Sequence, residues 1–327
     1  MPLSRMLADL RLPILQAPMF LVSSLSLAGA CCRAGIAGAF QLANPRTIGE
    51  LEQWLDAISA LERDCRARGE RFAPYAVNVN ANAIEQAGYR EKFDLCERAR
   101  VPLVVSSIGD PAALVARVHA WGGRVIHDVT TLRFAEKAAA AGVDGLMLTC
   151  AGAGGHTGAL SPFAFLPQVR RFFDGALVLA GGIAEAAGIR AALTLGADLV
   201  CMGTRFIATA ESVAPEDYKR MLVASATGDV IETDAIAGLT ANWLRPSIVA
   251  NGLDPDRLPP PAGRHRPDLP AGVRAWKTVW SAGHSVGLID DIPSVGSLAD
   301  RLERDLAGVL APDWRTRLAA RLRADAA

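Results

Sequence analysis

Residues 124–150 read RVIHDVTTLRFAEKAAAAGVDGLMLTC and predict a strand, a helix and a second strand. The runs at 124–129 and 144–150 are short and rich in aliphatic residues, as buried strands are. Between them, Thr131 is placed to cap the start of a helix and Gly142 to end it. This order of elements is the repeating unit of parallel sheets.

Similar apolar runs that end in small or polar residues occur on both sides of this unit. They are LPILQAP at 12–18, IAGAFQ at 36–41, PYAVNVN at 74–80, PLVVSS at 102–107, ALVLAGG at 176–182 and DLVCMGT at 198–204. Because helix-compatible segments separate these strands, the α/β pattern predicts a (β/α)8 or TIM barrel. A doubly wound sheet is the alternative, but it would usually open with a glycine-rich phosphate turn, which QAPMF at 16–20 lacks.

The regular alternation ends near residue 212, which divides the chain into three expected parts. Residues 1–212 would form the barrel, 213–280 a small, mainly helical lid inserted after the eighth strand, and 281–327 C-terminal return helices that pack on the barrel. The lid includes a proline-rich loop at 254–272. Its tryptophans are candidates either to line a substrate pocket or to form a core, and they are Trp243, Trp276 and Trp280.

The composition indicates a small-molecule partner. Lys and Arg number 34, as do Asp and Glu, so the balance gives no footprint for nucleic acid or an anionic membrane. No apolar run is long enough to span a bilayer, and Pro13, Gln16 and Pro18 break the N-terminal apolar region, which argues against a signal peptide. The six cysteines lack metal-site spacing, so we expect no metal and a cytoplasmic location.

Polar residues and glycines gather where the predicted strands end, the face on which barrel enzymes build their sites. AGGI at 180–183 and MGTRF at 202–206 expose backbone N–H groups suited to a phosphate, with Thr204 as a further donor. The competing interpretation is that these glycines serve packing alone. In CAGAGGHTG at 150–158, four glycines surround His156, which can accept a proton or donate a hydrogen bond to a developing anion.

One further motif is set aside. Residues 283–287, GHSVG, match the nucleophile elbow of serine hydrolases, in which the catalytic histidine follows the serine along the chain. No histidine follows His284, so we do not expect a serine hydrolase.

The chain resembles the nitronate monooxygenase family, formerly called 2-nitropropane dioxygenases. The segments that carry the resemblance are QAPM at 16–19, VNVN at 77–80, VIHDVT at 125–130, AGAGGHTG at 151–158, AGGI at 180–183, GADLVCMGTRF at 196–206 and SAGHSVGLIDDIP at 281–293. The resemblance implies FMN in the barrel mouth and no metal. The residues that would hold the FMN are Pro18, Met19, Asn78, Thr149, Gly154, Gly155, Ala180, Gly181, Gly182, Met202, Gly203 and Thr204.

The resemblance also implies a reaction, the oxidative denitrification of alkyl nitronates to carbonyl compounds and nitrite with O2. His156 would stand over the flavin as base or anion stabiliser, and its glycines would leave room for ring and substrate. Further candidates for substrate contact are His127, Ser281 and His284. Asp128 occupies a position where some relatives that use NADH carry a lysine, which argues against nicotinamide chemistry.

Two other functions remain open. One is an FMN-dependent NAD(P)H reductase of quinones or of enoyl-acyl carrier protein, and the other is a flavin- or phosphate-binding barrel without catalysis. The sequence decides neither the physiological substrate nor the oligomeric state, for which a homodimer is one option.

Overall fold

The computed structural model describes residues 3–8, 10–261, 263 and 268–308. The rest of the predicted C-terminal segment, residues 309–327, lies outside this description, as does His265 in the proline-rich loop. None of the helices in these ranges is long and apolar enough to cross a membrane.

The eight predicted strands are all present and form one parallel sheet in the order β1-β9-β8-β6-β5-β4-β3-β2. The two edge strands of this order, β1 and β2, are brought together by hydrogen bonds. The Gln16 N–H donates to the Ala37 carbonyl, and the Ala37 N–H donates to the Ile14 carbonyl. The sheet is therefore a nearly closed barrel, as predicted. Its strands are β1 (Ile14–Gln16), β2 (Gly38–Gln41), β3 (Tyr75–Asn80), β4 (Leu103–Ser107), β5 (Arg124–Val129), β6 (Gly145–Thr149), β8 (Ala176–Ala180) and β9 (Leu199–Met202).

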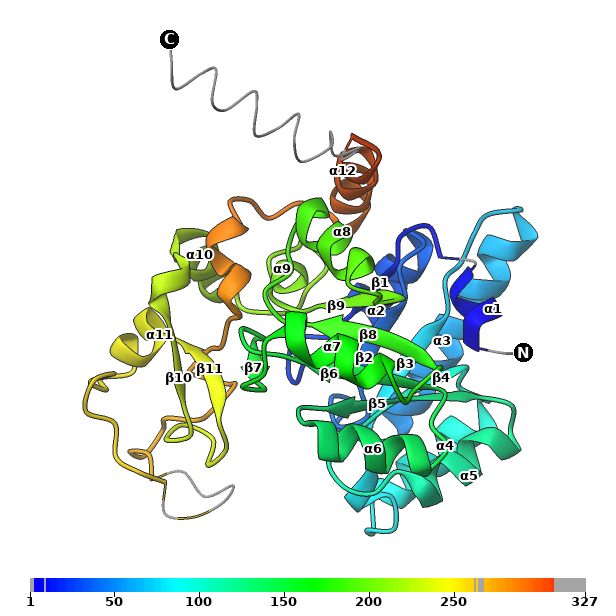
Figure 1. The fold of residues 1–327 in the computed structure, drawn as a ribbon, viewed down its shortest axis with the longest axis horizontal. Helices are drawn as coiled ribbons and strands as arrows, with labels where there is room; N and C mark the ends of the chain where they lie inside the picture. The colour runs from blue at the N-terminus through cyan, green and yellow to red at the C-terminus, as the bar shows by residue number, and fades with distance from the viewer. Residues whose placement is uncertain (1–2, 9, 262, 264–267, 309–327) are drawn as a thin grey trace.

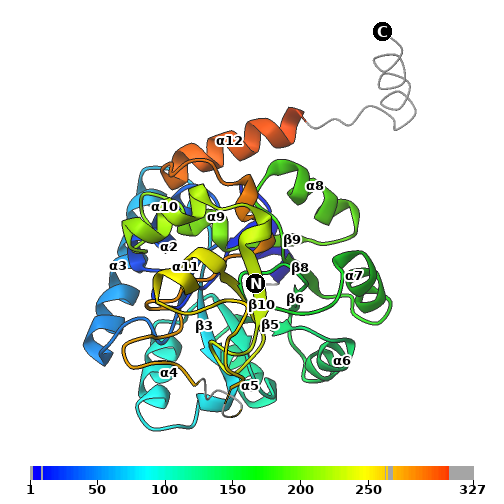
Figure 2. The ribbon, with the colours of Figure 1, turned by 90° about the vertical axis from the view of Figure 1, so that its left-hand side faces the viewer.

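Helices follow the strands and surround the barrel, which is clear when it is viewed from the C-terminal ends of the strands (Figure 2). They are α2 (Leu25–Arg33), α3 (Ile48–Ala67), α4 (Tyr89–Arg98), α5 (Ala112–Ala120), α6 (Leu132–Ala140), α7 (Pro162–Arg170), α8 (Ala186–Thr194) and the short α9 (Thr204–Ile207). The α6 helix begins and ends as its sequence predicts. The Thr131 hydroxyl accepts from the Phe134 N–H, and Gly142 takes a φ of +81° just beyond the C-terminus.

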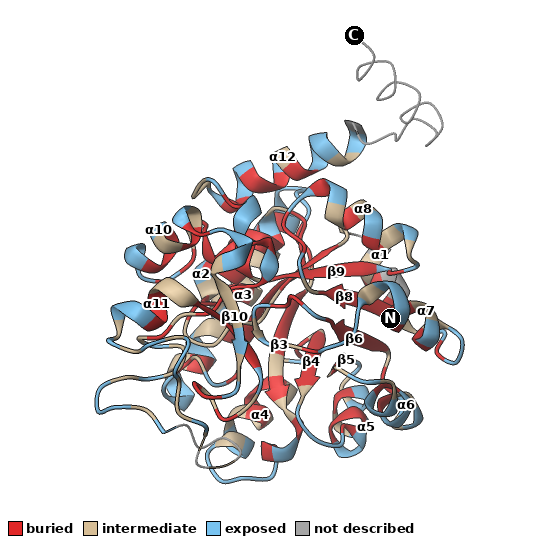
Figure 3. Ribbon diagram, turned by 60° about the vertical axis from the view of Figure 1, so that its left-hand side comes forward, coloured by how far each residue is buried: buried red, intermediate tan, exposed pale blue. Residues whose placement is uncertain are grey.

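Alternation along each strand creates two apolar layers. In β5, Val125 faces outward to the helices, whereas Ile126 faces inward and packs in the barrel with Val105 and Val178. The strands are buried, and exposed residues lie on the outer helical faces (Figure 3). Helix α1 (Leu3–Ala8) closes the N-terminal end of the barrel, since Leu3 and Met6 pack into the inner layer (Figure 1).

The segment after the eighth strand, residues 213–280, is called the lid below and lies over the opposite, C-terminal end of the barrel (Figure 1). Its helical parts are α10 (Glu216–Ala224), η2 (Thr227–Asp229) and α11 (Arg245–Ala250). It also contains β10 (Val230–Thr233) and β11 (Ala241–Leu244), which the sequence pattern did not indicate. These pair with a two-residue strand from the barrel, β7 (Gly155–His156), in a three-stranded antiparallel sheet.

The chain then returns through η3 (His284–Leu288) to α12 (Val295–Gly308). Helix α12 packs on α2 and α8, with Val295, Leu298 and Leu302 buried. Arg205, at 2% exposure, ties this return segment to the barrel, because it donates to the carboxylate and the carbonyl oxygen of Asp291.

Candidate active site

A cleft of about 1420 Å³ lies at the C-terminal ends of the strands, next to the lid. Its wall combines strand ends, the loop after β1, the loop around His156 and the lid residue Trp276. The residues expected to hold the flavin that line this cleft are Pro18, Met19, Asn78, Thr149, Gly154, Gly155, Ala180, Gly181, Gly182, Gly203 and Thr204.

The turn after β8 is shaped like an anion cradle. Gly181 and Gly182 have φ angles of +132° and +69°, which favour glycine. A Cβ on Gly182 would meet no heavy atom within 4 Å, so this turn faces open space in the cleft. Successive glycines in such a turn present backbone N–H groups to a ligand, and anions bind to such groups.

Thr204 adds a hydroxyl beside this turn. Its oxygen accepts a hydrogen bond of 2.9 Å from the Gly283 N–H. Because the oxygen serves as the acceptor there, the hydroxyl proton can be donated to a ligand in the cleft. The glycine turn and this hydroxyl together fit the phosphate end of a flavin nucleotide.

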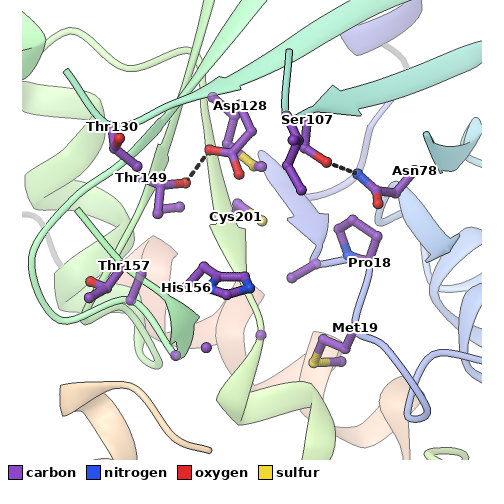
Figure 4. Close-up of a pocket in the computed structure, with 18 of the residues that line it drawn as sticks. Pro18, Met19, Asn78, Ser107, Asp128, Thr130, Thr149, His156, Thr157 and Cys201 are labelled. Atoms are coloured by element: carbon purple, nitrogen blue, oxygen red, sulfur yellow. Dashed lines mark hydrogen bonds between the residues drawn. The ribbon is translucent and has the colours of Figure 1, made fainter. Parts of the chain in front are cut away.

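His156 projects into the same cleft from strand β7 (Figure 4). The lid holds its backbone, because Ala241 and Asn242 of β11 pair with His156 and Gly155. The buried Asn242 amide also donates to the Ala153 carbonyl at 2.8 Å. The lid is thus part of what positions the imidazole.

Two glycines of the His156 loop are required by contacts within the protein. A Cβ on Gly154 would lie 2.8 Å from the Gly283 nitrogen and 2.9 Å from Thr204 Oγ1. A Cβ on Gly158 would collide with the Thr149 carbonyl oxygen. Close packing of the loop on β6 and on the return segment therefore explains these two glycines without a ligand.

The three lid tryptophans have different roles. Trp243 is fully buried in the lid core, and Trp276 packs on it and lines the cleft beside His156. Trp280 stacks on Tyr218 with ring centroids 5.0 Å apart. Only Trp276 of the three lines the cleft among the residues that the structure describes.

Two of the candidates do not line the cleft. The Met202 side chain is buried in the outer layer, because alternation along β9 turns Cys201 inward and Met202 outward. The exposed His284 lies outside the lining, and its backbone N–H donates to the Gly152 carbonyl. Ser281, in contrast, lines the cleft, and its carbonyl oxygen accepts from the Tyr218 hydroxyl.

His127 lines the cleft, as do several residues of α6. Alternation along β5 places it on the outer face of the barrel, where its Nδ1 lies 2.7 Å from the Ser106 hydroxyl. Burial lowers the pKa of His127 to about 4, so the imidazole is neutral at physiological pH.

Asp128 was not among the predicted site residues, yet it lies on the barrel side of β5 and lines the cleft. Thr149 Oγ1 donates to its Oδ1 at 2.5 Å (Figure 4). Burial raises the pKa of Asp128 to about 6, against the opposing effect of this hydrogen bond. Its position one residue before the end of a strand pointed to the cleft, but only the strand register shows which of His127 and Asp128 faces inward.

The cleft has few charges for its size. Among the described residues that line it, Lys137 is the only lysine or arginine, and Asp110 and Asp128 are the only carboxylates. A bound phosphate must therefore rely on backbone N–H groups and hydroxyls.

Comparison with known proteins identifies relatives of this chain. Residues 3–305 match the family model described as nitronate monooxygenase. A nitronate monooxygenase of Paraburkholderia phytofirmans is 32% identical over 295 residues, which are 76% of this chain and 78% of the relative. A (3aS,4S,5R,7aS)-5-hydroxy-7a-methyl-1-oxo-octahydro-1H-indene-4-carboxyl-CoA dehydrogenase of Mycobacterium tuberculosis is 29% identical, covering 72% of this chain and 64% of the relative.

Two solved structures are similar to this chain in fold. Nitroalkane oxidase from Streptomyces ansochromogenes aligns with a TM-score of 0.74 and 26% identity, covering 92% of this chain and 97% of the other. A FabK mutant from Thermotoga maritima aligns with a TM-score of 0.72 and 25% identity, covering 93% and 95%.

Proposed function

The chain belongs to the nitronate monooxygenase family of flavin oxidoreductases, and we propose that it oxidises alkyl nitronates to carbonyl compounds and nitrite with FMN and O2. The observation that supports this most is the placement of His156 in the same cleft as the Gly181–Gly182 turn. One cleft thus combines a cradle for a phosphate with an imidazole for the substrate.

The residues of the cleft fit FMN. The Gly181–Gly182 turn and the Thr204 hydroxyl would hold the phosphate, while Pro18, Met19 and Asn78 would border the ring system. When bound, FMN supplies the electron-accepting ring and the reaction with O2, which no side chain can supply.

His156 would bind the substrate. A neutral imidazole donates a hydrogen bond from one nitrogen, and a nitronate anion carries negative charge on its oxygens. A donor aimed at that charge fixes the anion in place. If a neutral nitroalkane binds instead, the other tautomer of His156 can accept the α-proton.

Residues 213–280 would act as a lid over this chemistry. Trp276 closes the wall beside His156, and strand β11 fixes the loop that carries the imidazole. Exclusion of water by such a wall strengthens the hydrogen bond from His156 to an anionic substrate, because the local dielectric falls.

The test is to mix the purified flavoprotein anaerobically with propyl-2-nitronate and to follow the flavin absorbance. Bleaching, followed by acetone and nitrite when O2 is admitted, is the expected result. An unchanged spectrum with nitronate but bleaching with NADH or NADPH would contradict the proposal and favour a reductase. Failure of the protein to bind FMN at all would contradict the cofactor assignment.

A further inference from the structure

Asp128 is an acidic side chain inside the barrel mouth. Its neighbour two residues earlier, Ile126, belongs to the inner apolar layer, and the same strand face carries the Asp128 carboxyl into the cleft. It lies near Thr149 of β6 and Cys201 of β9, on the barrel side of the cleft (Figure 4).

The carboxyl group has no cationic partner among the described residues. One oxygen, Oδ1, accepts from Thr149 Oγ1 at 2.5 Å, and the described structure gives Oδ2 no hydrogen bond. Among the residues that the structure describes, no arginine, lysine or histidine forms an ion pair with Asp128. A second carboxyl oxygen therefore remains to interact with a ligand.

None of the other described groups around Asp128 stabilises its charge through an ion pair. The thiols of Cys150 and Cys201 are the titratable groups close enough to sense its field, and both remain neutral, because burial raises the pKa of each. His156 lies across the cleft, whereas Lys137 and Asp110 are exposed at its border and have opposite charges. A flavin nucleotide adds a phosphate and displaces water, both of which further oppose ionisation.

We propose that Asp128 is a positioning residue for the flavin, which it binds as a neutral carboxylic acid that donates a hydrogen bond to a ring carbonyl or unprotonated ring nitrogen. This inference rests on the proposed flavin site. Burial raises the pKa of Asp128 to about 6, so above pH 6 the carboxyl must take up a proton from solvent when flavin binds.

The experiment measures FMN affinity, not activity. FMN is titrated into apoprotein from pH 5 to pH 8, with binding followed by quenching of flavin fluorescence, for the unaltered protein and for Asp128→Asn. Asparagine keeps the shape and a hydrogen-bond donor but carries no charge at any pH. Because the FMN phosphate itself titrates near pH 6, the quantity of interest is the ratio of the two Kd values, in which that contribution cancels.

We expect the Kd of the unaltered protein, divided by that of Asp128→Asn, to be constant near pH 5. Above pH 6 it should rise toward tenfold for each pH unit, as the linkage of one proton requires. Asp110→Asn is the matched control, because it removes an exposed carboxylate that borders the same cleft, and its ratio should not vary with pH.

If this ratio of Kd values does not change with pH, or falls as the pH rises, the inference is overturned while the flavin site is left intact. Absence of FMN binding in every variant would instead refute the flavin site, and the inference with it. If Asp128→Asn does not fold, Thr149→Val replaces it. Loss of the Thr149 hydroxyl should raise the pKa of Asp128, so that FMN binding begins to weaken at a higher pH. If binding begins to weaken at the same pH as in the unaltered protein, the result counts against the proposal.

Discussion

The indole ring of Trp276 meets the imidazole of His156 edge to face, with ring centroids 5.3 Å apart and planes inclined by 66°. Trp276 packs in turn on the fully buried Trp243, at 4.2 Å between centroids. Edge-to-face pairs of aromatic rings are stabilising. The lid therefore gives His156 a wall that is itself anchored in a core.

Replacement of Trp276 should separate this contact from backbone strain. Trp276 has a φ of +67°, which costs a residue other than glycine about 1 kcal/mol. Trp276→Ala and Trp276→Gly both remove the ring, so each should lower kcat/KM for a nitronate by about tenfold, the worth of one aromatic contact. Urea unfolding should find the glycine variant as stable as the alanine variant, or more stable by up to about 1 kcal/mol. Glycine relieves the backbone strain, and this gain offsets the larger conformational entropy of the unfolded glycine variant. A clearly less stable glycine variant would contradict this account.

Replacement of His156 should remove catalysis and spare the cofactor. His156→Ala is expected to lower kcat/KM for nitronate by about 10²- to 10⁴-fold, the usual range for loss of an acid–base group. The flavin should stay bound, because the proposed phosphate cradle is the Gly181–Gly182 turn and does not include His156. His284→Ala is the control, since this exposed histidine lies outside the cleft. Steady-state assays of nitrite release check both, and a normal rate in His156→Ala would exclude the proposed role.

Replacement of Gly158 should destabilise the fold. The new Cβ of Gly158→Ala would press on the Thr149 carbonyl oxygen at the end of β6, and we expect a loss of about 3 kcal/mol in the free energy of unfolding. Gly49→Ala is the comparison. Gly49 lies in helix α3, and no heavy atom would lie within 4 Å of its Cβ, so this change should stabilise by up to about 1 kcal/mol. Equal stability of the two variants in urea would show that the loop relaxes around Gly158.

His127 should make stability depend on pH in the acidic range. Burial lowers its pKa from 6.5 to about 4, so the folded state favours the neutral ring. That contribution is complete above pH 6.5 and is lost as the pH falls from 6.5 to about 4, by about 3 kcal/mol in all. His127→Asn, which cannot be protonated, should lose less stability over this range. Parallel curves of unfolding free energy against pH for the two proteins would contradict the prediction.

The sequence predicted the barrel because its strands carry their own signal. Runs such as LPILQAP and DLVCMGT are apolar on both faces, since one face meets helices and the other the barrel interior. Strands β10 and β11 lacked such a signal. VIET at 230–233 and ANWL at 241–244 are four residues each, and their pairing with Gly155 and His156 depends on contacts distant in sequence.

The sequence likewise predicted one part of the candidate site and not the other. Glycines and polar residues after the strands were visible as a group, but their side-chain directions depend on register. In β9 the register turns Met202 away from the cleft, and in β5 it turns Asp128 into the barrel mouth. Trp276 could be named as a candidate, yet only the fold separates its position from those of Trp243 and Trp280.

The pairing of β7 with β11 has a consequence for how such proteins diversify. Because Gly155 and His156 form a strand of the lid sheet, a change in the lid can alter the loop that carries His156 as well as the wall of the cleft. A chimera that exchanges the lid between relatives must therefore supply a compatible strand opposite residues 155–156. Replacement of the lid can therefore change substrate preference only where the new lid sequence preserves this short ladder.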